Sequence, residues 1–322
     1  MKSSRFQNKI AGSEFTLPVC AVLAVALWWL PEWTFSLNRV LGLLVCLLTT
    51  YIVMETNAQQ HIIRIRTRMM SCVWLVLATS LPFMHPFGEP IIAAAFLQAS
   101  YALLFRCYQR HRPQLNVFHA FLMLSLGSFF APVMLPMAIP FFLYIAVFLR
   151  SLTRKAFWAG IIGLIVPYWC YAAWMFLGVK GMELGAGRLP LEGLGIPDFS
   201  FAFGALPPVP DLSNIAILAL LLVVSSIHYL RTNYDDKIRV RMILYIYVSQ
   251  TLLLMAFLLL HPAHYQTTMA LLVASSSPLI AHYFSLSKGM LNAVFCVLFL
   301  LLVVALAVLN LWPTAFPYAF PT

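Results

Sequence analysis

The sequence predicts an all-α fold: a polytopic transmembrane helix bundle of about eleven helices, with the N-terminus inside the cell and the C-terminus outside. Three observations predict it. Hydrophobic residues make up 62% of the chain and charged residues 9%, whereas a soluble domain carries about 25% charged residues. The apolar residues gather in long stretches, and the basic residues fall between alternate stretches. We expect one integral membrane domain over residues 1–322.

Each predicted helix is an apolar stretch close to the roughly 20 residues that cross the hydrocarbon core. The stretches are 14–30, 38–55, 67–84, 89–106, 116–132, 133–150, 156–178, 213–230, 240–260, 266–286 and 290–312. The first resembles a signal peptide, because Lys2, Arg5 and Lys9 precede it. No small-residue cleavage site follows, so we expect an uncleaved membrane helix.

The basic residues predict the orientation, since short cytoplasmic connections are enriched in Lys and Arg. With the N-terminus inside, the inner connections hold 17 of the 20 basic residues, and the outer ones hold only Arg39, Lys180 and Arg188. Most acids fall on the outer side, namely Glu32, Glu89, Glu183, Glu192, Asp198 and Asp211. These charges therefore indicate membrane topology, and we expect no nucleic-acid partner.

The least regular part of the prediction is 116–150. Both ends carry inner-type arginines, so the chain must cross twice or dip and return. Pro132, Pro136 and Pro140 interrupt this stretch, and proline breaks helices by removing a backbone donor. Two short spans with a tight outer turn and a re-entrant pair both fit, and either one predicts a cavity wall; the alternative is a simple proline-kinked hairpin.

The longest predicted connection is the extracytoplasmic loop 179–212, between the seventh and eighth helices. It is rich in glycine and proline but contains no phosphate-binding glycine pattern. It is either an irregular ordered loop or a lid over a site on the outer face.

Ionisable residues are nearly absent from the predicted spans. All ten acids lie at helix ends or in connections, whereas ion-coupled transporters usually keep a carboxylate within the membrane. A transporter is therefore disfavoured.

Four side chains in two outer His-Pro turns form the first candidate site. His85 and Glu89 belong to "HPFGEP", and His261 and His264 belong to "HPAHYQ". If the two turns meet, His85, His261 and His264 are candidate ligands for a divalent cation, and Glu89 and His264 are candidate catalytic groups. The alternative is that the histidines only cap aqueous turns at the lipid boundary.

Glu32 in "LPEWTF" is the third catalytic candidate. Glycosyltransferases that use polyprenyl-phosphate sugars place an acid on the outer face near their first helix pair, and Glu32 falls at that position of the predicted topology. Trp33 beside it is equally typical of a plain membrane interface.

Other polar residues predict structural roles. Asp235 and Asp236 are followed by Arg239 and Arg241 rather than by a third acid, so we expect a loop that neutralises its own charge instead of a metal motif. Pro278, after three serines, is expected to free a backbone carbonyl in the tenth helix. The six cysteines show no CxxC spacing and are expected to be packing residues.

Several segments together resemble a family of uncharacterised multi-pass inner-membrane proteins of Bacteroidota. The matching segments are "METNAQQHIIRIRTRMMSCVWLVLATSLP", "LSLGSFFAPVMLPMAIPFFLYIAVFLR", "RKAFWAGIIGLIVPYW" and "LLLHPAHYQTTMALLVASSSPLIAHYFS". The resemblance implies the inner membrane of a didermal bacterium, and it transfers no residue roles.

Two function classes remain from the sequence. The first is an enzyme-like protein that handles a lipid-linked, polyprenyl-phosphate type substrate at the periplasmic face, favoured by the outer acids, the long loop and the broken helices. The second is a non-catalytic membrane subunit that positions other inner-membrane proteins, favoured by the absence of a sharp motif.

Overall fold

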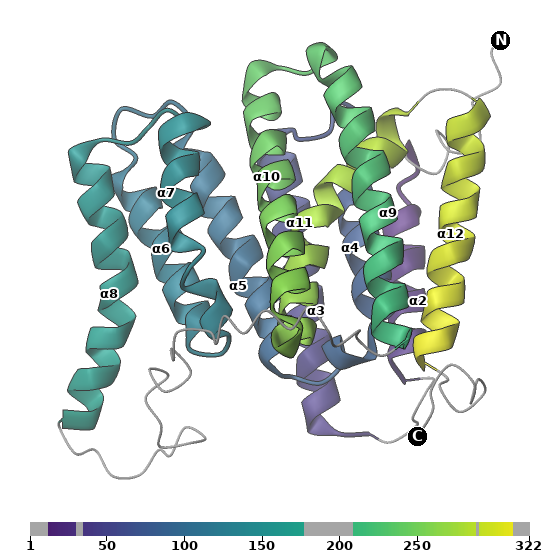
Figure 1. The fold of residues 1–322 in the computed structure, drawn as a ribbon, viewed down its shortest axis with the longest axis horizontal. Coiled ribbons are helices and arrows are strands. Elements are labelled where there is room, and N and C mark those ends of the chain that lie inside the picture. Colours follow the sequence, from purple (N-terminus) through teal and green to yellow (C-terminus); the bar gives the residue numbers. More distant parts are fainter. Residues whose placement is uncertain (1–11, 30–34, 177–208, 288–289, 312–322) are drawn as a thin grey trace.

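The computed structural model describes residues 12–29, 35–176, 209–287 and 290–311, and within them the regular elements are helical. Eleven α-helices are present in this part of the chain (Figure 1). They are α2 (Thr16–Trp29), α3 (Leu37–Gln60), α4 (Met69–Thr79), α5 (Glu89–Leu104), α6 (Gln114–Ser128), α7 (Ala138–Val147), α8 (Arg154–Phe176), α9 (Val209–Thr232), α10 (Ile238–Leu260), α11 (Tyr265–Leu286) and α12 (Met290–Leu311). Short 3-10 turns include η1 (Pro82–Met84), η2 (Phe105–Cys107), η3 (Pro132–Met134), η4 (Asn233–Asp235) and η5 (Pro262–His264).

The eleven-helix prediction is confirmed, because each predicted stretch overlaps one of these helices. Where helices are shorter than predicted, the largest differences are at prolines. α4 stops at Thr79, and Leu81 takes an extended backbone before Pro82. Likewise Ala131 is extended before Pro132, and α7 begins only at Ala138. A residue before proline is driven out of the helical conformation by the proline ring, so these helices are shorter than their apolar stretches.

The apolar helices mark the chain as a membrane protein by length and composition. Within the described residues, six helices are long and apolar enough to cross a membrane: Leu37–Gln60, Glu89–Cys107, Arg154–Trp174, Asp211–Asp235, Ile238–Leu260 and Pro262–Leu286. α2, α4, α7 and the second half of α12 are shorter apolar helices.

Successive helices run in opposite directions, so the connections gather at two ends of the bundle (Figure 1). At one end, Arg64 between α3 and α4 pairs with Asp235 and Asp236 between α9 and α10. At the same end, the Gln109 amide after α5 donates to the Leu149 carbonyl after α7. We call this the arginine end, defined by connections 61–68, 105–113, 148–153 and 233–237.

The other connections meet at the opposite end. There the Phe87 amide, before α5, donates to the Asn38 carbonyl at the start of α3 at 3.0 Å. Asn310 near the end of α12 donates to the Ser80 carbonyl after α4, also at 3.0 Å. The helices therefore place successive connections at alternate ends of the bundle, in the order that the basic residues predicted.

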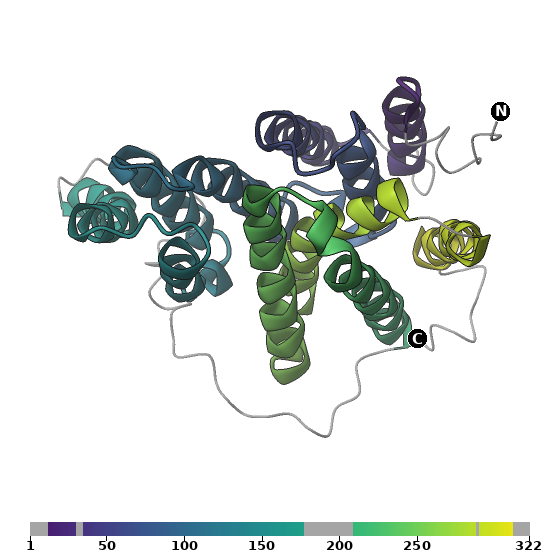
Figure 2. The ribbon, with the colours of Figure 1, turned by 90° about the horizontal axis from the view of Figure 1, so that it is seen from above.

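α11 is the central helix of the bundle. It packs against α4, α5, α9 and α10, and all of its residues except Gln266 and Leu286 are buried (Figure 2). Pro278 lacks an N–H, so the Ala274 carbonyl loses its partner within the helix. The Gln98 side-chain amide of α5 donates to that carbonyl at 2.6 Å. The carbonyl predicted to be freed by Pro278 is therefore used to bind a neighbouring helix.

The segment 116–150 forms two short antiparallel helices, α6 and α7. Their connection contains η3, and Phe130 there stacks on Phe96, two helical turns inside the start of α5. The hairpin turns back at that depth and returns to the arginine end, where Gln109 contacts Leu149. α8 packs along α6 and closes this side of the bundle.

Candidate functional site

The predicted histidines at the opposite end do not share one site. His85 is buried and stacks on Trp28 of α2, with ring centroids 4.2 Å apart. Its Nε2 atom donates to the Thr79 carbonyl at 3.0 Å. Burial and the nearby Arg39 guanidinium lower the pKa of His85 to about 4, against the opposing effect of the Thr79 contact. A neutral imidazole in this position is a packing group at the end of α4.

Gly42 makes this arrangement possible. A Cβ on Gly42 of α3 would lie 2.0 Å from the His85 carbonyl oxygen, so no larger residue fits while the 80–88 connection holds its position. The Phe87 amide bond to Asn38 fixes the connection on the same helix.

The other predicted residues differ from His85 in burial and contacts. Glu89 and His264 are exposed, and His261 is buried with its ring 4.9 Å from Phe257 on the same helix. The two turns do meet, because Phe83 packs edge-on against Tyr265 at 5.8 Å. Among the described residues, however, no three His, Cys, Asp or Glu side chains gather as metal ligands. Glu32 and most of the loop 179–212 lie outside the described residues.

Neutral polar side chains occupy the interior at this end. The Asn214 amide of α9 donates to the Tyr265 hydroxyl at 3.1 Å, and Asn310 of α12 donates to the Asn214 oxygen at 2.8 Å. Asn310 also holds the Ser80 carbonyl. These bonds link the ends of α4, α9, α11 and α12, which is a structural role.

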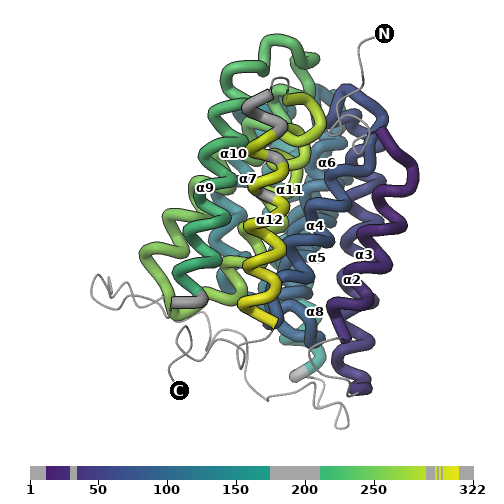
Figure 3. Tube along the Cα trace, turned by 90° about the vertical axis from the view of Figure 1, so that its right-hand side faces the viewer, coloured from purple at the N-terminus to yellow at the C-terminus, as the bar shows by residue number. Residues whose placement is uncertain are grey.

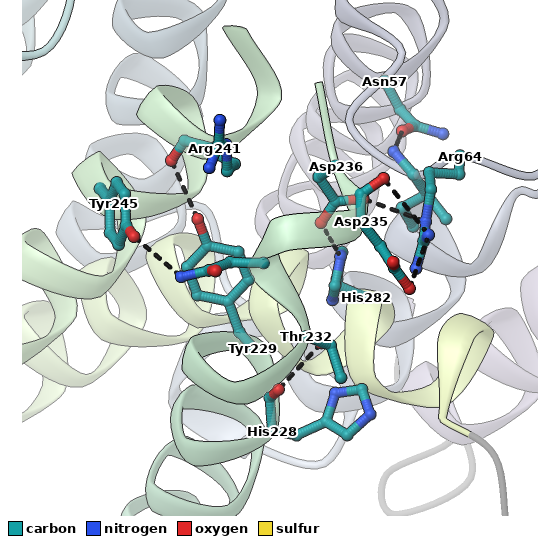
Figure 4. Close-up of polar contacts among 12 residues, drawn as sticks. Asn57, Arg64, His228, Tyr229, Thr232, Asp235, Asp236, Arg241, Tyr245 and His282 are labelled. Carbon is teal, nitrogen blue, oxygen red and sulfur yellow. Dashed lines mark hydrogen bonds and ion pairs between the residues drawn. The ribbon is translucent and has the colours of Figure 1, made fainter. Parts of the chain in front are cut away.

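The arginine end holds the strongest cluster of charged residues in the described chain (Figure 4). Asp236 has a side chain with 0% exposure, and its two oxygens lie 3.0 Å from Arg64 Nε and 3.1 Å from His282 Nε2. Arg64 also lies 3.3 Å from Asp235, which is 43% exposed. The cluster joins the 61–68 connection, the α9–α10 connection and the central helix.

Hydrogen bonds hold the α9–α10 connection in place around this cluster. The Tyr229 hydroxyl donates to the Arg241 carbonyl at 3.0 Å, and the Asn233 amide donates to the Tyr245 hydroxyl at 2.8 Å. The Tyr229 ring meets His282 edge-on, 5.6 Å away. The connection is therefore rigid enough to place Asp236 against α11.

The prediction that this loop neutralises its own charge is wrong. Asp235 and Asp236 are paired with Arg64 and His282, which come from other parts of the chain. Arg239 instead donates to Gln60 at the end of α3.

A pocket of about 510 Å³ opens beside Arg64 at the arginine end. This volume lies within the range of small-molecule sites, about 300–1,000 Å³. It is bounded by the residues that precede α2, the last two turns of α3 and the connection to α4. Its lining residues are Gly12, Ser13, Glu14, Met54, Glu55, Asn57, Ala58, His61, Ile63, Arg64, Ile65, Arg66, Thr67 and Arg68.

The wall formed by the 61–68 connection is fixed by α3. His61 ends the helix in the left-handed conformation, with φ 52°. The Asn57 side chain then binds the connection at two points, accepting from the Ile63 amide at 3.3 Å and donating to the Thr67 carbonyl at 3.1 Å. The arginines between these points are thereby held along the pocket.

The charges on the pocket wall are unequal. Arg64 is shared with Asp235 and Asp236, while Arg66 and Arg68 are exposed and form no ion pair with a described residue. Glu14 and Glu55 also line the pocket, so its lining carries three guanidinium groups and two carboxylates. The pocket thus offers donors for an anion, together with acceptors for hydroxyl or ammonium groups of the same ligand.

Comparisons with protein-family models, with curated proteins and with solved structures find no match for this chain. The geometry of the arginine end is therefore the basis for a functional assignment.

Sequence reasoning did not single out this site, although one signal pointed to it. The arginines in "RIRTR" alternate with Ile65, which is 40% exposed, and Thr67, which is buried, and the positive-inside rule explains all three arginines as topology markers. The segment is short and follows directly after a long helix, so the end of that helix can hold its arginines along one wall of a site.

Proposed function

We propose that the protein is a multi-pass protein of the cytoplasmic membrane that binds a phosphate-bearing ligand at its arginine end. The observation that carries the proposal is the pocket of about 510 Å³ lined by Arg64, Arg66 and Arg68. Guanidinium groups bind phosphate through two parallel hydrogen bonds, and two of these three groups have no carboxylate partner among the described residues.

The charge distribution supports a cytosolic position for the pocket. Of the 14 basic residues that the structure describes, all except Arg39 belong to segments at the arginine end. Under the positive-inside rule this end faces the cytosol.

This proposal moves the ligand site from the periplasmic face, where the sequence predicted it, to the cytosolic face. Support for the change comes from the two ends of the bundle. At the opposite end, no group of three His, Cys, Asp or Glu side chains that could hold a metal is found among the described residues. At the arginine end, a pocket and unpaired cations occur together.

Binding tests the proposal directly. The full chain is placed in nanodiscs of dioleoyl phosphatidylcholine, and farnesyl diphosphate and inorganic pyrophosphate are titrated while thermal unfolding is followed. A ligand that binds only the folded state raises the unfolding temperature as its concentration increases. At least one of the two probes is expected to do so, and added salt should weaken the effect because the arginines are exposed.

Matched charge variants make the test specific. Arg66→Gln with Arg68→Gln is expected to weaken binding about tenfold or more, the equivalent of about 1.4 kcal/mol. The control is Arg110→Gln with Arg112→Gln, which removes the same charge from an exposed connection outside the pocket. Equal losses in both variants, or no binding of either probe, would show that the pocket is not a phosphate site.

A further inference from the structure

We infer that the ligand is a membrane amphiphile whose phosphate group occupies the pocket while its hydrocarbon chain lies between α2 and α3. This inference rests on the proposed function, because it assigns the source of the phosphate group. It adds that the ligand enters sideways from the bilayer rather than from the cytosol.

The packing of the first three helices supports sideways entry. α2 and α3 both pack against α4 and make few contacts with each other. α2 lies at the edge of the molecule (Figure 3). Each helix therefore leaves the flank that faces the other largely uncovered, with α4 behind them.

The two helices are joined at one end and separated at the other. At the opposite end, the Trp28 indole of α2 donates to the Arg39 carbonyl of α3 at 3.2 Å. At the arginine end, the pocket lies between Glu14, before α2, and the Met54–His61 turns of α3. The two helices are therefore in contact at the opposite end, whereas the pocket lies between them at the arginine end.

The surfaces beside the pocket are apolar. Ala24 and Trp28 are the buried residues of α2, while Val19, Val22 and Leu23 are more than half exposed. On α3, an exposed apolar stripe leads to the pocket; its members are Leu44, Leu47, Leu48 and Tyr51.

The pocket itself continues this apolar character. Met54, Ala58, Ile63 and Ile65 contribute to its lining beside the charged groups. Except for Ile63, which is buried, these side chains would face water beside a free phosphate, whereas a prenyl or acyl chain would cover them. A ligand held in the bilayer by its chain also meets the arginines at a high effective concentration.

Three probes in the same phosphatidylcholine nanodiscs separate the amphiphile from its parts. Farnesyl diphosphate carries both the anionic group and the chain, inorganic pyrophosphate only the group, and farnesol only the chain. Farnesyl diphosphate is expected to bind at least about tenfold more tightly than pyrophosphate, and farnesol should compete only weakly.

A steric variant tests the path of the chain. Ala58 is exposed on the pocket wall, so Ala58→Phe should fill the space beside the headgroup. The variant is expected to weaken the binding of farnesyl diphosphate about tenfold and to leave the binding of pyrophosphate unchanged. Leu143→Phe, on the exposed face of α7 and away from the pocket, is the matched control.

The outcomes distinguish the two proposals. Equal affinity for pyrophosphate and farnesyl diphosphate, or equal effects of Ala58→Phe on both, would overturn the amphiphile and leave the phosphate site standing. Binding of farnesyl diphosphate that is unaffected by Arg66→Gln with Arg68→Gln would overturn both. The inference would be supported if Ala58→Phe weakened the binding of farnesyl diphosphate alone and left the unfolding temperature of the ligand-free protein unchanged.

Discussion

Asp236 is the residue whose removal should cost the most stability at the arginine end. Its carboxylate is fully buried between Arg64 and His282. Breaking a buried ion pair by removing one partner typically costs about 3–5 kcal/mol. Arg64 is 35% exposed and can regain water, whereas His282 cannot. We therefore expect Asp236→Ala to lower the free energy of unfolding by about 3 kcal/mol, near the lower limit of that range.

The loss should also show a defined dependence on Arg64. Asp236→Asn keeps the shape and an acceptor for His282, so about half of the loss is expected. The double variant Arg64→Ala with Asp236→Ala should lose about as much free energy of unfolding as Asp236→Ala alone. Once Asp236 is removed, Arg64 has no buried carboxylate to bind, so its own removal adds little. Unfolding of the detergent-solubilised protein by sodium dodecyl sulfate, followed by tryptophan fluorescence, measures these differences.

Asp235 provides the control for this reasoning. It is 43% exposed and 3.3 Å from Arg64, and exposed pairs contribute about 0–1 kcal/mol. Asp235→Asn should therefore be nearly neutral. The reasoning is refuted if Asp236→Ala costs less than about 1 kcal/mol, or if Asp235→Asn costs as much.

Three further predictions concern other parts of the bundle. His85 has a pKa of about 4 in the folded protein against an ordinary 6.5, so the unfolded chain takes up the proton first. The free energy of unfolding should then fall by up to about 3 kcal/mol as the pH is lowered from 6.5 to 4. His85→Phe should flatten this pH profile. An unchanged profile in the variant would contradict the assignment of the pH dependence to His85. Gln98→Leu should cost about 1–3 kcal/mol in the same unfolding assay, and adding Pro278→Ala should recover most of it by restoring the helical N–H; no recovery would count against the Gln98 contact. Cys20 and Cys72 are free thiols in contact across α2 and α4. Copper phenanthroline added to the native protein should therefore protect both from maleimide after denaturation, whereas Cys72 should remain labelled in Cys20→Ser. Full labelling of both would place α2 elsewhere.

The helices were predictable because their signals are local. An apolar stretch of membrane-spanning length specifies a helix without reference to the rest of the chain, and the prolines near 82 and 132 shorten helices through their own neighbours. The freed carbonyl below Pro278 was also predictable, since it follows from the missing N–H. Its partner was not, because Gln98 is 176 residues away from Ala274.

The site at the arginine end was hidden for the same reason. Asp236 and His282 are 46 residues apart, and Arg64 and Asp235 are 171 apart. Their meeting depends on how the helices pack, which periodicity and charge counts do not encode. The histidines of the outer turns had a conspicuous local pattern instead, but a pair of His-Pro turns does not fix where the rings point.

The α6–α7 hairpin has a consequence for the surrounding lipid. A helix of 15 residues rises about 22 Å and one of 10 residues about 15 Å, whereas the hydrocarbon core is about 30 Å thick. Ile139, Leu143 and Val147 of α7 remain exposed on the outside of this short pair. Acyl chains touching them must shorten or tilt, at a cost of a fraction of a kcal/mol per Å of mismatch. The protein should consequently carry a locally thinned annulus on this flank and gather short-chain or unsaturated lipids there.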